Sequence, residues 1–287
     1  MLELGILLAL ACALGTNVAL LCKHRGAVAT PAVCLSRPLW SAAALFRSPW
    51  WTIGFGIAVG AWGLHVAALA LAPLSLVETT ISGALVLLAW IAERWFGVRV
   101  GVREWLGLGL CAAGLSLLAI TSVGAGDGSA SYSVGAMVSF EAGAVGIGAL
   151  LLLSGSAGTA GRGTGPLLAA ASGLLLGVAN VSVKALTGTV PADLLSIVSP
   201  WTVAAAVAGV GAFFGLARGL QTGQAIPVIA ITSVTANCAS ILGGILVFGD
   251  PVGSDPLSVV ARGAAFAAVI AAVALMPAPR RASHAYA

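Results

Sequence analysis

The chain has 287 residues, of which 60% are hydrophobic and only 8% are charged, and its formal net charge is +4. A water-soluble domain carries about a quarter of its residues as Asp, Glu, Lys or Arg, so this composition excludes a soluble protein and indicates that most of the surface faces the lipid bilayer. The positive charge is not gathered into basic patches interleaved with aromatic residues, which argues against nucleic acid as a partner.

Apolar stretches of about 20 residues, the length that crosses a bilayer as a helix, recur along the whole chain. Nine spans are predicted, at residues 2–22, 50–72, 74–92, 104–122, 133–153, 166–186, 196–217, 222–248 and 257–277. These stretches are too long for barrel strands of about 10 residues, and backbone groups cannot stay unpaired in hydrocarbon. The sequence therefore predicts an all-α polytopic membrane protein with about nine transmembrane helices. Because the N-terminus lacks a basic region, the first span is expected to be retained.

Residues 27–48 are moderately apolar but are interrupted by Arg37 and Pro38. An arginine in the middle of a spanning helix is costly. We therefore expect a loop with an amphipathic piece that lies on the membrane. The alternative is a tenth span, which would invert the orientation of every later helix.

The distribution of basic residues predicts the orientation of the chain. With the N-terminus outside, 11 of the 13 Lys and Arg residues fall in the inside segments, as the positive-inside rule requires. The protein is thus expected in the inner (plasma) membrane, with residues 278–287 as a cytoplasmic tail. Tryptophans are expected to form an interfacial belt at the span ends; these are Trp50, Trp51, Trp90, Trp95, Trp105 and Trp201.

An internal repeat divides the chain into residues 1–122 and 133–277. The segment LALAPLSLVETTISGALVLLAWIAER (69–94) has a counterpart at residues 216–250, and LLALACALGTNVALLCKHR (7–25) loosely matches LLAAASGLLLGVANVSVKAL (167–186). The matching helices run in opposite directions across the membrane, so the halves would form an inverted repeat, an arrangement suited to alternating access. The alternative is that Gly/Ala/Leu-rich helices align by composition alone.

Ionisable residues inside the predicted spans are the first candidates for function, because a charge at that depth costs several kcal/mol. His65 and Glu78 flank the turn at Pro73 and are expected to be neighbours that bind a cation or relay a proton. The alternative is a neutral packing histidine and a protonated or snorkelling glutamate. Glu141 lies deeper, and Lys184 is expected either to pair with it or to join it at the substrate.

Uncharged polar residues recur at corresponding places in the two halves. Asn17 and Thr16 lie in the first span, Asn180 and Ser182 in the sixth, and Asn237 follows Thr232, Ser233 and Thr235 in the eighth. Such residues either line a hydrophilic path or bridge packed helices. The substrate-binding candidates are Glu78, His65, Glu141, Asn17, Asn180, Lys184 and Asn237. No catalytic set or phosphate-binding loop is present, so neither an enzyme nor a resident cofactor is expected, and the metal question stays open.

Residues 48–120 resemble the drug/metabolite transporter superfamily, with EamA-like character, and are most similar to its NIPA-like magnesium-transporter branch. The similarity lies in the tryptophan pair that starts the second span, the Ala-Pro turn at residues 72–73 and the Glu-Arg end at residues 93–94. VSVKAL and IPVIAITSV are similar to second-half counterparts. Glu78 and His65 stand where that branch usually carries an uncharged polar residue and an asparagine.

The resemblance implies a secondary transporter that moves a small solute or cation. Mg²⁺ would require hard oxygen ligands, whereas an organic cation would require a carboxylate and aromatic walls, for which Trp62 is a candidate. The alternative from a different class is a non-transporting integral membrane subunit or scaffold, in which buried polar groups only hold helices together. A homodimer is possible under either hypothesis.

Overall fold

The computed structural model describes residues 2–34, 37–71, 80–81, 84–97, 100–121, 132–157, 164–187 and 198–249, together with residues 260–261, 263–265, 267–268 and 271–272. Over these residues the chain is helical and contains no strand. The helices are α1 (Leu2–Val28), α2 (Pro38–Phe46), α3 (Pro49–Leu71), α5 (Leu85–Phe96), α6 (Val102–Thr121), α7 (Val134–Ala157), α8 (Thr164–Thr187), α9 (Pro200–Thr222) and α10 (Ala225–Phe248).

Five helices are long and apolar enough to cross a membrane, counted over the described residues. They are α1, α7, α8, α9 and α10, and they correspond to the spans predicted at residues 2–22, 133–153, 166–186, 196–217 and 222–248. The protein is therefore an all-helical, multi-pass membrane protein. The predicted span at residues 257–277 lies largely outside the described residues, and that at 74–92 is described continuously only from residue 84.

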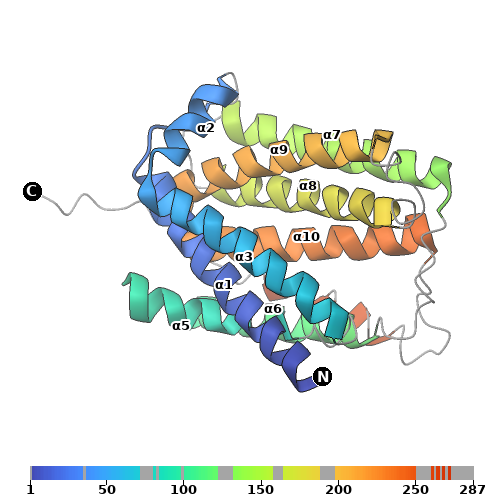
Figure 1. The fold of residues 1–287 in the computed structure, drawn as a ribbon, viewed down its shortest axis with the longest axis horizontal. Helices are drawn as coiled ribbons and strands as arrows, with labels where there is room; N and C mark the ends of the chain where they lie inside the picture. Colours follow the sequence, from blue (N-terminus) through green and yellow to red (C-terminus); the bar gives the residue numbers. More distant parts are fainter. Residues whose placement is uncertain are drawn as a thin grey trace, which may run out of the picture.

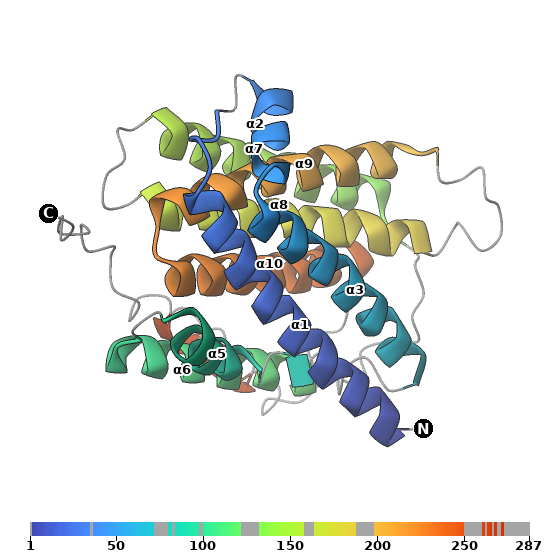
Figure 2. The ribbon, with the colours of Figure 1, turned by 60° about the vertical axis from the view of Figure 1, so that its left-hand side comes forward.

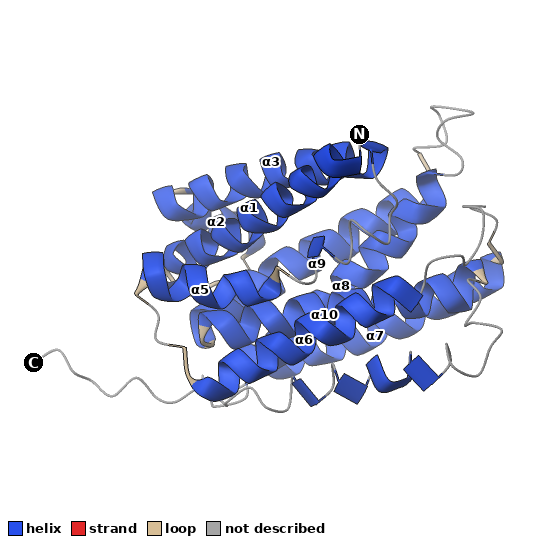
Figure 3. Ribbon diagram, turned by 90° about the horizontal axis from the view of Figure 1, so that it is seen from below, coloured by secondary structure: helices blue, strands red, loops and turns tan. Residues whose placement is uncertain are grey.

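The long helices form two groups, one of α7, α8, α9 and α10 and the other of α1, α3, α5 and α6. Helices α7, α8, α9 and α10 run nearly parallel or antiparallel to one another, and α8 packs against the other three (Figure 1). Helices α1 and α3 lie side by side and cross that group obliquely, while α5 and α6 lie together along another side (Figure 2; Figure 3). One end of the bundle contains the last residues of α1, α5, α7 and α9 and the first residues of α3, α6, α8 and α10. Helix α2 also lies there, so we call it the α2 end.

Small residues bring the helices of each group close together. A Cβ atom on Gly54 of α3 would lie 2.7 Å from the carbonyl oxygen of Ala19 in α1. A Cβ on Gly173 or Gly177 of α8 would overlap the backbone or Cβ atoms of α10. Gly56 has nothing within 4 Å of its Cβ position, because it is rotated by about 200° from Gly54 around the helix axis.

The helix ends follow local sequence signals. Ser199 accepts a hydrogen bond from the backbone N–H of Thr202, and Pro200 occupies the first helical position, so α9 begins at residue 200 rather than 196. Glu104 accepts a hydrogen bond from the backbone N–H of Gly101 at 2.8 Å, which caps α6. Gly97 and Gly249 end α5 and α10 with positive φ angles of 64° and 69°, a conformation that favours glycine.

Residues 27–48 do not form a span in the structure. Helix α1 continues to Val28, six residues beyond the predicted end, and α2 has only nine residues, about 14 Å at 1.5 Å per residue. The additional residues of α1 are held by cation–π contacts, in which Lys23 lies over the ring of Phe55 and Arg25 over that of Trp50. The expected loop with a short surface helix is therefore what the chain forms.

The tryptophans divide between the membrane-facing surface and the core. Trp50, Trp90 and Trp95 are exposed, as expected for an interfacial belt. Trp51, in contrast, is only 1% exposed and meets the ring of Phe213 edge to face at 5.6 Å. The prediction that Trp51 belongs to the interfacial belt was wrong. Helix α1 packs directly against Trp51, because Gly26 has no side chain and the Trp51 backbone lies where a Cβ atom would be.

Candidate functional site

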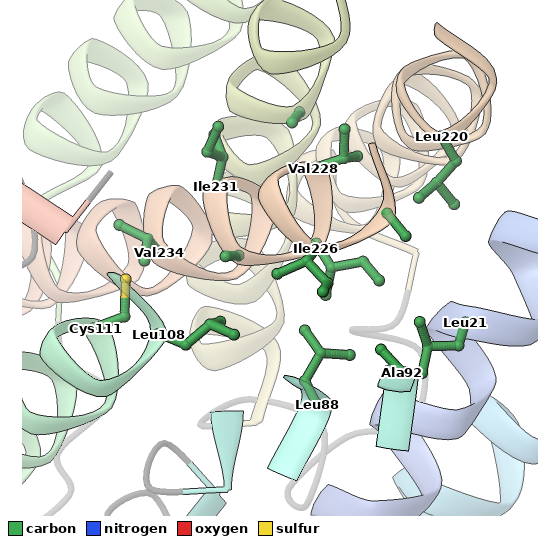
Figure 4. Packing of buried hydrophobic residues seen from close by; sticks show 14 of the residues in the cluster. Leu21, Leu88, Ala92, Leu108, Cys111, Leu220, Ile226, Val228, Ile231 and Val234 are labelled. Carbon is green, nitrogen blue, oxygen red and sulfur yellow. The ribbon is translucent and has the colours of Figure 1, made fainter. Parts of the chain in front are cut away.

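A layer of apolar side chains joins the two groups of helices at the α2 end. Leu88 of α5 and Leu108 of α6 face Ile226 and Val234 of α10, and Leu21 of α1 completes the contact (Figure 4). All five side chains are buried. We call these five residues the apolar layer. It excludes water from the space between the groups over the first half of α10.

A polar stripe continues the same face of α10 beyond the apolar layer. Asn237 follows Ile226 by 11 residues, which is close to three full turns, so both side chains leave the helix on the same side. Ser233 and Ser240 lie about 20° and 40° to one side of the Ile226 direction, and Asn237 lies about 20° to the other side. All three polar residues are partly buried. The face of α10 therefore changes from apolar to polar along its length.

Asn180 of α8 joins this stripe. Its Nδ2 atom donates to the hydroxyl of Ser240 at 3.2 Å. Gly173 and Gly177 on the same face of α8 set the close approach to α10, and Asn180 itself remains exposed. Asn180, Asn237 and Ser240 thus form one polar region on α8 and α10. Ser240 had not been singled out from the sequence, although it lies one turn beyond Asn237.

Asn17 lies on α1 one turn from Leu21 of the apolar layer. Its Nδ2 atom donates to the backbone carbonyl oxygen of Ala84 at 2.9 Å, and the contact is buried. Ala84 is the N-terminal capping residue of α5 and offers no side-chain cap of its own. The asparagine therefore binds the chain at the point where α5 begins.

Glu141 of α7 is nine-tenths buried and contacts α8. Its Oε1 atom lies 2.6 Å from the hydroxyl of Ser182, and that hydroxyl also lies 3.0 Å from the carbonyl oxygen of Val178. A hydroxyl has one proton and cannot donate to both acceptors at once. The shorter contact is the one in which the Ser182 hydroxyl donates to Oε1 of Glu141, so a hydrogen bond from α8 holds this buried carboxyl group.

Lys184 of α8 contacts the aromatic ring of Phe248 in α10. Its ammonium nitrogen lies 4.3 Å from the centre of the Phe248 ring, whereas Glu141 is bound by Ser182. Lys184 and Ser182 are two residues apart, so they leave α8 on nearly opposite sides. The expected Glu141–Lys184 contact stays a prediction. Ser182 and Asn180 are also two residues apart, so Glu141 does not meet the face of α8 that carries Asn180.

The remaining candidates are Glu78, His65 and Trp62. Glu78 lies outside the described residues, so its expected approach to His65 is not tested. His65 is partly buried on α3. Trp62 is 69% exposed, which contradicts its expected role as a wall around an organic cation, because this side chain points away from the neighbouring helices.

The residue that sequence analysis missed most clearly is Gln221, near the end of α9. Its amide Nε2 donates to the carbonyl oxygens of Ala27 and Pro31, both at 3.0 Å, and its Oε1 accepts from the backbone N–H of Val33 at 2.9 Å. Gln221 thus fastens the second half of the chain to the loop that follows α1. A polar residue at a span end gives no signal of such a role.

Taken together, these side chains offer amide and hydroxyl groups along one face of α10 and, on α7, the buried carboxyl group of Glu141. No group of three or more His, Cys, Asp or Glu residues comes together within the described ranges. A metal would therefore have to be held by neutral oxygen atoms as well as by a carboxylate. Comparison with family models, with curated proteins and with solved structures gives no match for this chain.

Proposed function

We propose that the protein is a secondary transporter of the drug/metabolite type, which moves a small solute or cation by alternating access between two inverted halves. The observation that carries the proposal is a recurring contact. In each half, an asparagine on the opening helix binds the matching later helix: Asn17 of α1 binds Ala84 at the start of α5, and Asn180 of α8 binds Ser240 of α10.

Helix pairing supports the same repeat. The opening helix of each half packs extensively against the next long helix, α1 against α3 and α8 against α9. Glycines occupy both contacts, since Gly54 faces Ala19 and Gly215 faces Ser172. In this scheme α3 corresponds to α9, the predicted spans at 74–92 and 104–122 correspond to α10 and 257–277, and α7 is an additional helix at the start of the second half. The total is nine spans.

The apolar layer and the polar stripe fit a transporter that is closed at one end. The predicted cytoplasmic residues Lys23, Arg25, Arg47, Arg94 and Arg218 all belong to the α2 end, so the closed end would face the cytoplasm and the N-terminus would lie outside. Opening toward the cytoplasm would separate Leu88 and Leu108 from Ile226 and Val234. The substrate would then pass along the face that carries Asn237 and Asn180.

Glu141 supplies the charge in this scheme. Glu141 accepts a hydrogen bond from Ser182, which compensates an ionised carboxylate at this depth only in part, so the ionised form would favour a cation or a rearrangement of α7 and α8. Uncharged amides and hydroxyls would complete the binding of an organic cation or of partly hydrated Mg²⁺. Glu78 and His65 are retained as a second candidate pair at the opposite end.

The test is uptake into proteoliposomes that contain the purified full chain. A panel of Mg²⁺, other divalent cations and small organic cations is tried first, with and without a proton gradient. Asn180→Ala and Asn237→Ala are then expected to reduce uptake at least tenfold, whereas Ser139→Ala, on the exposed face of α7, leaves it unchanged. Equal uptake by all three variants would contradict a path along this stripe.

A second function, that of a non-transporting membrane subunit or scaffold, is favoured by a different observation. The hydrogen bonds of Asn17, Asn180 and Glu141 all connect one helix with another, as interhelical contacts in a rigid bundle would. The two functions are separated by Glu141→Gln. A scaffold, for example a homodimeric one, keeps its assembly and shows no flux in the wild type or in the variant. A transporter loses the proton dependence of its uptake in the variant.

A further inference from the structure

A groove at the α2 end is built from three consecutive parts of the chain. The loop after α1 contributes Thr30 and Pro31, α2 contributes Trp40 and Arg47, and the start of α3 contributes Trp50. The groove has a volume of about 390 Å³ and is open on one side. It lies apart from the polar stripe, so the transport path does not account for it.

The groove is positively charged without a nearby acidic segment. Arg47 lines it directly, and the guanidinium of Arg25 lies 4.3 Å from the centre of the Trp50 ring at its margin. The sequence contains no Asp or Glu between residues 4 and 77, although it contains four Lys or Arg residues there. Among the described residues, no carboxylate forms an ion pair with Arg25 or Arg47. An anion from outside the chain is therefore the complementary partner.

Apolar side chains around the groove show what kind of anion fits. Leu39 of α2 is 86% exposed, and Trp40 and Phe46 are also exposed, while the buried side of α2 includes Ser41. In water this pattern would be unfavourable, but it is typical of a helix that rests its apolar side chains in the acyl region of a bilayer. Tryptophans prefer the headgroup level. The groove thus opens where lipid headgroups meet acyl chains.

The walls of the groove are held in place before any ligand binds. Gln221 fixes the carbonyl oxygens of Ala27 and Pro31, and the hydroxyl of Ser41 bonds to the backbone of Cys34 in both directions, at 3.0 and 3.1 Å. Phe46 packs between Phe55 of α3 and Phe213 of α9. A site with fixed walls loses little entropy on binding.

We propose that this groove binds the headgroup of an anionic phospholipid from the bilayer. The phosphodiester contacts the guanidinium of Arg47, which can donate two parallel hydrogen bonds to phosphate oxygens, and Arg25 adds charge at the margin. Trp40 and Trp50 flank the glycerol, and the acyl chains extend over the exposed side of Phe46. A soluble anion would satisfy Arg47 but would leave Leu39 and Phe46 uncovered.

The experiment uses the full chain purified in a neutral detergent, with thermal unfolding as the readout. Dioctanoyl phosphatidylglycerol is titrated against dioctanoyl phosphatidylcholine and inorganic phosphate. We expect phosphatidylglycerol alone to raise Tm in a saturable manner. Arg47→Gln is expected to weaken its half-saturation about fivefold, the effect of one basic residue at a membrane surface. Arg103→Gln, an exposed arginine of α6 at the same end but outside the groove, is the matched control and should bind as the wild type does.

Three results would overturn the proposal. An equal shift with phosphatidylcholine would mean that the headgroup charge is not recognised, and an equal shift with inorganic phosphate would mean a soluble anion site. An equal loss in Arg103→Gln would mean diffuse surface charge. If Arg47→Gln does not fold, fluorescence quenching of the wild-type protein tests the proposal. Phosphatidylglycerol with brominated chains must quench tryptophan fluorescence more than brominated phosphatidylcholine does, and Trp40→Phe must reduce that difference.

Discussion

Asn17 and Ala84 are joined by a buried 2.9 Å hydrogen bond from the asparagine amide to the backbone carbonyl oxygen. Ala84 also accepts from the backbone N–H of Leu87, so its carbonyl uses both lone pairs where α5 begins. The bond spans 67 residues and connects the first helix of the chain with the span that carries Glu78. It therefore determines how two elements of the first half are arranged.

Asn17→Ala removes this bond and leaves a buried carbonyl with a single partner. We expect the free energy of unfolding to fall by about 1 to 2 kcal/mol, measured by equilibrium unfolding of the purified protein in mixed micelles. Asn180→Ala is the matched control, because its bond to Ser240 is exposed, and it should cost less than half as much. Equal losses would contradict a special role for the Asn17–Ala84 contact.

The contact between α1 and α3 depends on the absence of a side chain at Gly54. A Cβ there would lie 2.7 Å from the carbonyl oxygen of Ala19 and 3.0 Å from Cys22, so Gly54→Ala forces the helices apart. We expect it to destabilise the protein by about 1 to 3 kcal/mol. Gly56→Ala, which meets nothing within 4 Å, should be neutral or slightly stabilising. A chemical-denaturation series on the two variants distinguishes them.

The hydrogen-bond pattern at Glu141 predicts opposite outcomes for two substitutions. Glu141→Gln keeps a side-chain oxygen that accepts from the Ser182 hydroxyl and should change the free energy of unfolding by less than about 1 kcal/mol. Glu141→Ala removes the partner of Ser182 and opens a gap between α7 and α8, so it should cost about 2 kcal/mol or more. A large destabilisation by Gln would mean that the native group is a paired carboxylate. Stability in detergent at neutral pH provides the comparison.

Cys111 of α6 and Cys238 of α10 belong to the same cluster of packed side chains and are both free thiols. Opening at the α2 end would move α6 away from α10, so a short bifunctional thiol reagent that joins these cysteines should block uptake. The extent of cross-linking is measured on a gel after cleavage at a protease site inserted between residues 122 and 132. The two fragments separate only when the cross-link is absent. Cys238→Ser is the control. Uptake that persists in fully cross-linked protein would contradict alternating access at this contact.

Much of the fold was predictable because a bilayer imposes a length on every spanning helix. Predicted spans at 133–153 and 222–248 correspond to Val134–Ala157 and Ala225–Phe248, and the charged break at residues 37–38 correctly predicted a surface helix rather than a span. Helix ends were less accurate. Helix α1 extends past Lys23 because its basic residues rest on the rings of Phe55 and Trp50, which are contacts between distant parts of the chain.

The sequence by itself determined that this is a helical membrane protein with polar residues at depth, since chain length and apolar composition follow directly from the thickness and dryness of the bilayer. Only the tertiary structure decided which way each helix is rotated. Lipid and helix interiors are both apolar, so hydrophobic periodicity does not distinguish the face of α8 that carries Ser182 from the one that carries Asn180. The rotation is set by the positions at which glycines allow two helix backbones to approach closely. It places Glu141 beside Ser182, buries Trp51 and leaves Trp62 exposed.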